Sequence, residues 1–283
     1  MKPKPECNPC FLRQMDIAVR LVGGDAALRE KVKNSTLQLL KKLGTKHNPP
    51  YIATVLFRNA YRLLGHDDPY LALKKEYNEK AKKFHPFLEK LIARAADPLA
   101  EALKMALAGN IIDFGILEKF DLDKTLKKTL KLRLPQNKVR SIRKRIAAAK
   151  TILYIADNAG EIGFDYFLIS EIHRINPLAK IYLSVKKTPI INDATKEDAL
   201  FFGLGRYASI LDSGDNWIGT HPRLCSKTFL KAYDTAGLII SKGQANYESL
   251  EEQHDPRILF LLKSKCPVVS RSLKVKLNDV VMK

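Results

Sequence analysis

The sequence predicts an α/β protein, with a mostly parallel, doubly wound sheet in its C-terminal half and a helical cap in its N-terminal half. From residue 151 onward, short β-branched and aromatic runs alternate with segments of helical apolar spacing, which is typical of a parallel sheet with helices on both faces. Residues 1–120 show mostly helical spacing. In this chain of 283 residues we therefore expect two domains, a helical cap domain at 1–120 and an α/β domain at 121–283.

Glycine and proline divide the N-terminal half into helices. Gly23-Gly24 interrupts the first apolar stripe, and Gly44 and Gly65 stand where the next two helices are expected to end, since glycine adopts the left-handed conformation there readily. Asp68-Pro69 and Asp97-Pro98 each predict an N-cap followed by proline at the first helical position. The predicted helices are Cys10–Val22, Ala26–Leu43, Tyr51–Leu64 and Leu99–Ala108.

The chain is strongly basic, and residues 121–150 are a dense part of that charge. The formal net charge of +19 indicates an anionic partner, such as a phosphorylated metabolite, nucleic acid or an acidic surface. Residues 121–150 hold eleven Lys or Arg against two Asp, so a nucleic-acid-binding surface is one hypothesis. Because this stretch has no aromatic residue to stack on bases, we prefer a solvated face on a helix at Val139–Lys150.

Strands and helices alternate after residue 150. The predicted strands are Thr151–Ala156, Lys180–Val185, Tyr207–Leu211, Gly237–Ser241, Ile258–Leu262 and Pro267–Ser270. The predicted helices are Glu161–Ile175, Lys196–Phe202 behind a Thr195 cap, and Arg223–Ala232.

Composition indicates the cellular setting. No apolar run approaches the roughly eighteen residues of a transmembrane helix, and the N-terminus lacks the apolar core of a signal peptide, so we expect a cytoplasmic protein without a membrane span. Four cysteines in a chain of this length do not indicate a disulfide framework. Cys7-x-x-Cys10 is compatible with half of a zinc site, a redox pair or two buried thiols.

Polar residues follow four of the predicted strands where the strands end. Asp157-Asn158 follows the first strand and Lys186-Lys187 the second, while Asp212–Asp215 and Ser241–Gln244 lie at the ends of the third and fourth. In a parallel sheet these ends meet at one edge, where open α/β folds bind ligands. Carboxylate and amide oxygens suit a hard divalent cation, whereas ammonium groups and glycine amides suit a phosphoryl group. This edge is therefore the candidate site.

Several nucleotide-binding classes fit the sequence poorly. No G-x-G-x-x-G follows the first strand, and Lys186-Lys187 stands where a dinucleotide or adenosyl-methionine site favours an acidic residue, so a Rossmann-like methyltransferase is kept only as an alternative. An aspartyl-phosphate mechanism favours a second Asp where Ala159 stands, which indicates water rather than Asp157 as nucleophile. Asp193, in the loop after the second strand, fits a third metal ligand or a helix cap.

Three blocks of the chain resemble the signature of the damage-control phosphatases, which are metal-dependent phosphatases with an ARMT-like fold. These blocks are Asp157–Glu161 with Asp165, Asn192–Thr195 and Ser241–Glu248. Cys7–Cys10 and Ala108–Gly115 resemble the branch of the family found in archaea and in the C-terminal domain of a pantothenate-kinase-like protein. The resemblance covers nearly the whole chain, and three ordered blocks are more specific than any one alone.

The resemblance implies hydrolysis of phosphomonoesters of small metabolites, damaged or surplus ones among them. It implies that Asp157, Asn158 and Asp193 hold a divalent cation, namely Mg²⁺, Mn²⁺, Co²⁺ or Ni²⁺. Asp157 is then a catalytic residue together with Lys242, which offsets charge in the transition state, and Glu161, which orients water or caps the helix dipole.

The candidate substrate-binding residues are Lys186, Asp215, Gly243 and Asn246. Lys186–Pro189 stands where the family often has an arginine or a glycine-rich turn, and lysine binds phosphate as a point charge rather than as a fork. We therefore expect a substrate preference that differs within the family. The sequence does not fix the physiological substrate, the metal used in cells or the oligomeric state.

Overall fold

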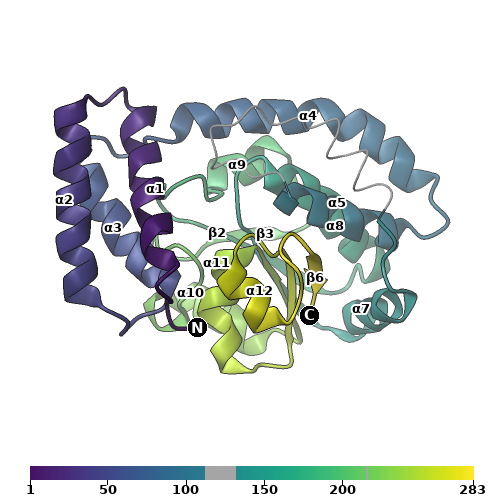
Figure 1. The fold of residues 1–283 in the computed structure, drawn as a ribbon. Helices are drawn as coiled ribbons and strands as arrows, with labels where there is room; N and C mark the ends of the chain where they lie inside the picture. Colours follow the sequence, from purple (N-terminus) through teal and green to yellow (C-terminus); the bar gives the residue numbers. More distant parts are fainter. Residues whose placement is uncertain (112–131, 215) are drawn as a thin grey trace.

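A computed structural model describes residues 1–111, 132–214 and 216–283, and within them six strands form one sheet (Figure 1). The strands are β1 (Thr151–Ile155), β2 (Lys180–Val185), β3 (Ser209–Asp212), β4 (Leu238–Lys242), β5 (Ile258–Lys263) and β6 (Val280–Met282). Strands β1 to β5 pair in parallel, and β6 pairs antiparallel with β5. The prediction of a mostly parallel sheet is confirmed.

The strand order is β3-β2-β1-β4-β5-β6, so the chain changes its direction of winding between β1 and β4. It first moves outward from β1 to β3, then returns to β4 beside β1 and moves outward on the other side. Ile155 pairs with Ser241 at the carboxyl ends of these two strands. Ligands of open α/β sheets bind at such a switch point, and the residues that follow β1 and β4 therefore lie at the favoured place for a site.

Helices cover both faces of the sheet because alternate side chains of each strand point to opposite sides. Ile152 and Tyr154 lie in one hydrophobic cluster, and Leu153 and Ile155 lie in another. The first cluster is covered by α4 (Leu71–Ala93), α5 (Pro98–Ile111), α7 (Gln136–Ala148), α8 (Glu161–Ile175) and α9 (Lys196–Phe201). The second is covered by α10 (Lys227–Thr235), α11 (Gln244–Leu250) and α12 (Pro267–Leu273).

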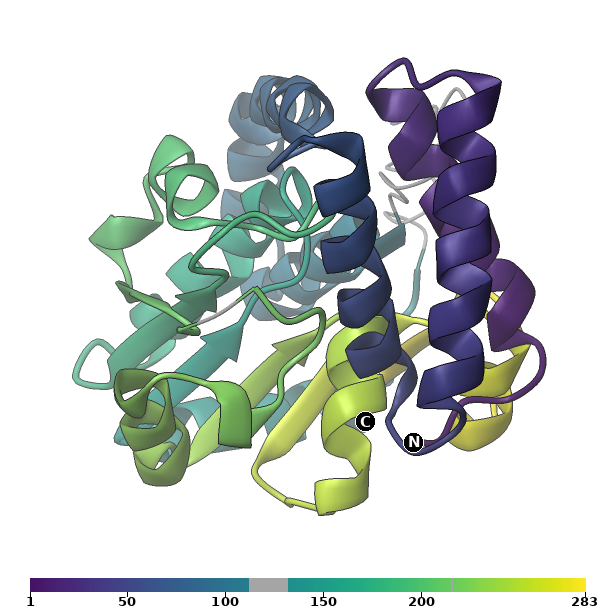
Figure 2. The ribbon, with the colours of Figure 1, turned by 90° about the vertical axis from the view of Figure 1, so that its left-hand side faces the viewer.

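Three N-terminal helices pack around a third hydrophobic cluster (Figures 1 and 2). They are α1 (Cys7–Leu21), α2 (Ala26–Leu43) and α3 (Pro49–Leu64). The Asn48 side chain accepts a hydrogen bond from Tyr51 N and starts α3. Ile190 and Ile218, from loops at the carboxyl ends of β2 and β3, complete this cluster. The N-terminal helices are therefore packed directly against the loops of the sheet.

The division into two domains stays a prediction, and so does the capping role of the first. The expected boundary near residue 120 lies outside the described residues, as do Lys127 and Lys128 of the basic stretch. Within the described part of the basic stretch, residues 132–150, Arg143 forms an ion pair with Asp97 (2.6 Å).

The last predicted strand, Pro267–Ser270, is wrong, because these residues begin the helix α12. Proline at the first helical position and Cys266, whose Sγ accepts from Val269 N, favour a helix start over a strand. The sixth strand is β6, near the C-terminus.

Several helix starts also differ from the sequence prediction, since α1 begins at Cys7 rather than Cys10 and α7 at Gln136 rather than Val139. The segment predicted as one helix, Arg223–Ala232, begins inside a 3₁₀ turn at Pro222–Leu224. It continues in α10, which the Ser226 side chain caps. The helix expected after Asp68-Pro69 begins at Leu71 with Tyr70 as its N-cap. Further 3₁₀ turns lie at Leu204–Arg206 and Glu251–Gln253.

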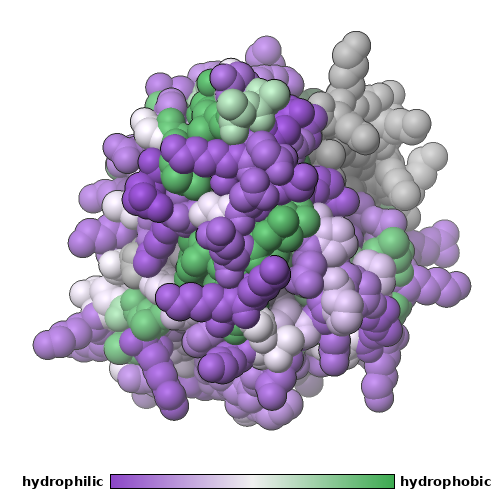
Figure 3. Space-filling view, turned by 60° about the vertical axis from the view of Figure 1, so that its left-hand side comes forward, coloured by the Kyte–Doolittle hydropathy of each residue, from purple (hydrophilic) through white to green (hydrophobic). Residues whose placement is uncertain are grey.

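Hydrophilic side chains predominate on the face shown in Figure 3, where hydrophobic ones form separate patches. Among the described helices, none has the length and apolar character needed to cross a membrane.

Candidate functional site

The backbone brings the three predicted metal ligands together. Asp157 and Asn158 follow β1, and Asn158 forms an isolated antiparallel bridge with Asp193 from the loop after β2. A backbone hydrogen bond from Ala194 N to Asp157 O (2.9 Å) holds the same two segments together. The ligand candidates thus become neighbours through main-chain pairing, which does not depend on their side-chain rotamers.

The turn after these residues is fixed by a side chain from α4. Gly160 has a φ of 72°, and its N–H donates to Asn78 Oδ1 (2.6 Å). Asn78 Nδ2 in turn donates to Asp198 Oδ1 (2.6 Å), and Asp198 forms a capping box with Thr195 at the start of α9. This chain of bonds joins the starts of α8 and α9, which flank the candidate ligands, and thereby fixes both loops.

Lys242, at the end of β4, is enclosed by two carboxylates of α8. Its Nζ donates to Glu161 Oε1 (2.7 Å) and Asp165 Oδ1 (2.5 Å), and all three side chains are completely buried. Burial raises the pKa of Asp165 to about 6, although the Lys242 charge opposes the rise. The same carboxylates raise the Lys242 pKa despite its burial, so its ammonium group stays charged.

Asn158 connects this charged group to the candidate metal ligands. Its Nδ2 donates to Asp157 Oδ2 (2.9 Å) and to Glu161 Oε2 (3.1 Å). These two bonds use both N–H groups of the amide and leave its oxygen, the atom that would bind a cation, outside them. Gly109 of α5 lies close to Glu161, since a β-carbon on it would be 3.0 Å from Glu161 Cγ. Of the Ala108–Gly115 block, residues 112–115 lie outside the described residues.

Gly243, which follows β4, lies directly against Asp157. Its φ is 81°, and a β-carbon there would lie 1.9 Å from Asp157 Oδ2. Only glycine fits this position, because both the positive φ and the space exclude a side chain. The predicted substrate-binding glycine therefore borders the first candidate ligand.

Two other predicted substrate-binding residues are engaged within the protein. Lys186 Nζ donates to Trp217 O and Gly219 O (2.6 Å each) and lies 3.6 Å from Asp193 Oδ2. Two of the three N–H donors of the ammonium group are thus used by main-chain carbonyls, and Asp193 is its ion-pair partner. Lys186 thus lies beside a candidate ligand but points its charge into the loop after β3.

Asn246 holds the main chain around the site. Its Nδ2 donates to Ala156 O (3.1 Å) and Lys242 O (2.7 Å), and its Oδ1 accepts from Thr220 Oγ1 (2.8 Å). The side chain joins the ends of β1 and β4 to the loop after β3. Asp215, the fourth predicted substrate-binding residue, lies outside the described residues.

The site carries excess negative charge. Three buried carboxylates, Glu161, Asp165 and Asp193, face two buried lysines, Lys186 and Lys242. The partly buried Asp157 and Lys265 add one charge of each sign, so the carboxylates exceed the ammonium groups by one. Desolvation raises the Asp157 pKa well above its ordinary value, and the charges of Glu161 and Asp193 raise it further. Burial raises the pKa of Asp193 to about 6, against the opposing charge of Lys186.

This donor set fits a hard divalent cation. Two carboxylates and one amide supply oxygen ligands, which Mg²⁺ and Mn²⁺ prefer, and the positive charge of the cation would offset the excess negative charge. In the described part of the chain, no three His, Cys, Asp or Glu side chains converge on a metal position, and the candidate set differs because one ligand is an amide. The zinc interpretation of Cys7 and Cys10 therefore finds no further ligands among these residues, and neither cysteine forms a disulfide.

The sequence prediction missed Lys265, which follows β5. Its positive charge opposes the rise in the Asp157 pKa, and this effect is larger than that of the Lys242 charge. Lys265 N donates to Gln244 Oε1 (2.9 Å), and its side chain is partly buried. The same strand-end signal that identified Lys242 also identifies Lys265, but the erroneous strand at Pro267–Ser270 made this segment look like a short connection between strands.

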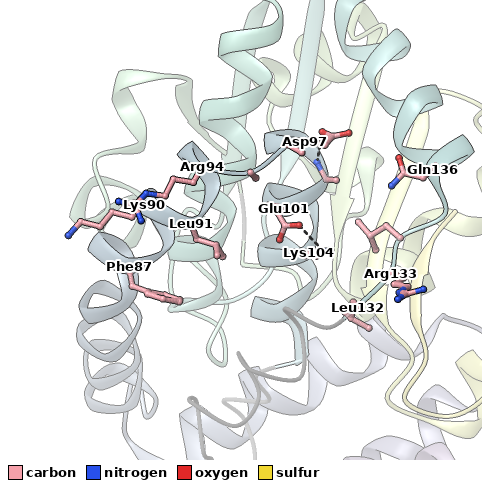
Figure 4. Close-up of a pocket in the computed structure, with 14 residues that line it drawn as sticks. Phe87, Lys90, Leu91, Arg94, Asp97, Glu101, Lys104, Leu132, Arg133 and Gln136 are labelled. Carbon is pink, nitrogen blue, oxygen red and sulfur yellow. Dashed lines mark hydrogen bonds and ion pairs between the residues drawn. The ribbon is translucent and has the colours of Figure 1, made fainter.

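A cavity of about 890 Å³ lies apart from these residues (Figure 4). Phe87 and Leu91 of α4, Glu101 of α5, and Leu132 and Arg133 are among its lining residues. None of the predicted site residues that the structure describes lines it. Its lining combines apolar side chains with charged ones such as Glu101 and Arg133, and we assign it no part in that site.

Comparisons with known proteins give consistent matches along the chain. A family model described as the damage-control phosphatase ARMT1-like domain matches residues 4–281. A damage-control phosphatase of Pyrococcus horikoshii is 36% identical over 283 residues, covering 99% of this chain and 97% of that protein. A damage-control phosphatase of Archaeoglobus fulgidus is 31% identical over 287 residues, covering 100% of this chain and 99% of that protein.

The fold gives the same result. The crystal structure of a DUF89 family protein from Pyrococcus horikoshii superposes with a TM-score of 0.91 at 34% sequence identity. The match covers 100% of this chain and 98% of that one. The similarity seen in three short sequence blocks thus extends over the whole length and the whole fold.

Proposed function

Because the chain belongs to the damage-control phosphatase ARMT1-like family, we propose that it is a divalent-metal-dependent phosphatase that hydrolyses phosphomonoesters of small phosphorylated metabolites. The family membership supports the phosphatase activity. The metal requirement and the substrate class are proposed from the residues of the site.

The observation that carries the proposal is the pairing of Asn158 with Asp193 beside Asp157 at the switch point of the sheet. It joins three oxygen ligands in a group whose buried carboxylates exceed its buried lysines by one charge. A divalent cation held there would polarise a phosphoryl oxygen and lower the pKa of a water molecule. An anionic substrate without such a cation would face net repulsion.

The two cationic side chains Lys242 and Lys265 have different roles in the proposed reaction. Lys242 is held behind the ligands by Glu161 and Asp165, and from there it offsets negative charge that develops during the reaction without touching solvent. Lys265 lies at the partly exposed edge and supplies the positive charge that attracts the phosphoryl group. Gly243 lets the main chain after β4 lie directly against the Asp157 carboxylate, which a side chain at this position would displace.

Glu161 orients water in this proposal, and its hydrogen bonds give it a second role in holding Asn158. One of its oxygens accepts from Lys242 and the other from Asn158. It therefore positions the amide ligand directly. We assign Glu161 to both roles, and its replacement by Gln should disturb the ligand group as well as the water.

The proposal is tested by hydrolysis of p-nitrophenyl phosphate with purified protein, with and without Mn²⁺ or Co²⁺. We expect metal-dependent hydrolysis by the wild type and a loss of at least about 100-fold in Asp157→Asn, since an essential ligand is altered. Asp234→Asn, at an exposed position on α10, is the control and should keep wild-type activity. A wild type that is inactive with every metal, or a fully active Asp157→Asn variant, would contradict the proposal.

A further inference from the structure

One face of α3 contacts both loops that surround the candidate metal ligands. Tyr51, Thr54, Arg58 and Tyr61 are spaced by three, four and three residues, so they line one side of the helix. The first three residues of this face contact the loop after β3. Tyr61 contacts the loop after β2, which carries Asp193.

The contacts to the loop after β3 form a stack and one buried hydrogen bond. Trp217 lies against the Tyr51 ring (4.6 Å between centroids) and beneath the Arg58 guanidinium (4.4 Å). Thr54 Oγ1 accepts a hydrogen bond from Ile218 N (2.9 Å). The helix therefore holds this loop by ring stacking, cation–π contact and main-chain bonding.

Tyr61 contacts the other loop through a hydrogen bond, beside the packing of Ile190 into the same hydrophobic cluster. Ile191 N donates to the hydroxyl oxygen of Tyr61 at 3.0 Å, and the Tyr61 side chain is 8% exposed. The bonded residue stands two positions before Asp193. Tyr61 thus reaches from the N-terminal helices to the main chain of the ligand loop.

Ile191 has a backbone conformation that its side chain disfavours. It lies in a turn closed by a hydrogen bond from Asp193 N to Ile190 O (3.1 Å), and its φ is 42°. A positive φ at the first central position of a turn is normally filled by glycine. For a β-branched residue it is a strained state that persists only where the surroundings hold it. Strain of this kind clusters at functional sites.

We infer that Tyr61 is a positioning residue, which holds the strained Ile190–Asp193 turn in the shape that presents Asp193 to the metal. The inference rests on the proposed metal-dependent function. Tyr61 does not touch the candidate ligands themselves, and it acts through the main chain of Ile191. Asp193 in turn pairs with Asn158 through the backbone bridge. The Tyr61 hydroxyl, on a helix outside the sheet, therefore stabilises the group of candidate ligands.

Tyr61→Phe tests the inference because it removes only the hydroxyl. We expect Mn²⁺ binding to the metal-free protein, measured by titration calorimetry, to weaken about tenfold, as for other groups that orient metal ligands. Hydrolysis should need correspondingly more Mn²⁺ for half-maximal rate, while the rate at saturating metal changes much less. Tyr70→Phe is the matched control, because Tyr70 is buried in the same hydrophobic cluster and should bind Mn²⁺ as the wild type does.

A second variant separates loss of the turn from general damage to the helices. Ile191→Gly relieves the strain, since glycine takes a positive φ without cost. In that background the added Tyr61→Phe change should weaken Mn²⁺ binding less than it does in the wild type. An equal loss in both backgrounds, or Tyr61→Phe binding Mn²⁺ like the wild type, overturns the inference. A wild type that neither binds Mn²⁺ nor hydrolyses the phosphate ester overturns the proposed function instead.

Discussion

Gly243 and Asp157 come so close that a β-carbon on the glycine would lie 1.9 Å from the Asp157 carboxylate oxygen Oδ2. The contact joins the ends of β1 and β4, the two strands between which the winding of the sheet reverses. At the switch point, the Asp157 carboxylate therefore occupies the space that a side chain of residue 243 would need.

Gly243→Ala should displace Asp157 and abolish most activity. The methyl group cannot share the space with the carboxylate, and the φ of 81° is strained for alanine. We expect a loss of about 100-fold or more in kcat/KM, the order associated with a misplacement of about 1 Å at a reacting centre. Steady-state kinetics with p-nitrophenyl phosphate and saturating Mn²⁺ measures it.

Gly203→Ala is the control for this change. Gly203 also has a positive φ (73°), but a β-carbon there would meet nothing within 4 Å. It should therefore lose some stability through backbone strain and keep its activity. Equal loss of activity in both variants would show that strain, and not the contact with Asp157, explains the effect.

Local signals in the sequence were enough to predict the sheet and the first two ligand candidates. The apolar run before Asp157-Asn158 and the Gly160 turn specify a strand, a sharp turn and a helix within fifteen residues. These features depend on neighbours along the chain. The Pro267–Ser270 error arose at the same level, because proline and a polar cap were outweighed by two valines.

The partners of the lysines could not be predicted in this way. Lys186 appeared to be a phosphate ligand, yet its Nζ donates to carbonyls more than thirty residues further along the chain. Lys242 binds two carboxylates of α8 that no spacing rule connects to it. The contact of Tyr61 with Ile191 spans 130 residues. Such contacts are set by how the loops pack, and a single sequence does not record that packing.

Lys242→Met should strongly destabilise the metal-free protein. It leaves Glu161 and Asp165 buried without their common cation, and breaking a buried ion pair in this way costs about 3–5 kcal/mol. Adding Asp165→Asn to Lys242→Met should restore part of the loss, because one of the two unpaired charges disappears. Urea unfolding of the two single variants and the double variant measures the coupling, and strictly additive effects would contradict it.

Glu248 should make stability depend on pH. Burial raises its pKa from the ordinary 4.5 to about 7, so between these values the folded chain holds a proton that the unfolded chain has lost. The wild type should therefore lose stability relative to Glu248→Gln as the pH rises from 4.5 to 7, by up to roughly 3 kcal/mol, and remain at that difference above pH 7.

Urea unfolding of both proteins across this range measures the difference, in which the contributions of other groups cancel. Glu79→Gln, at an exposed position on α4, is the control for replacing a glutamate on a helix. A Glu248→Gln difference that does not change between pH 4.5 and 7 would refute the prediction.

Lys186→Met distinguishes a support for the loop from a ligand for phosphate. The change keeps an apolar chain but leaves the carbonyls of Trp217 and Gly219 without their donor, which costs about 1–3 kcal/mol for a buried acceptor. Since Trp217 is the single tryptophan, its emission should shift to longer wavelength as the loop loosens. Lys187→Met, at the exposed neighbouring position, should leave the emission unchanged. If emission is also unchanged in Lys186→Met and only inhibition by inorganic phosphate is lost, Lys186 binds the substrate and the support role is wrong.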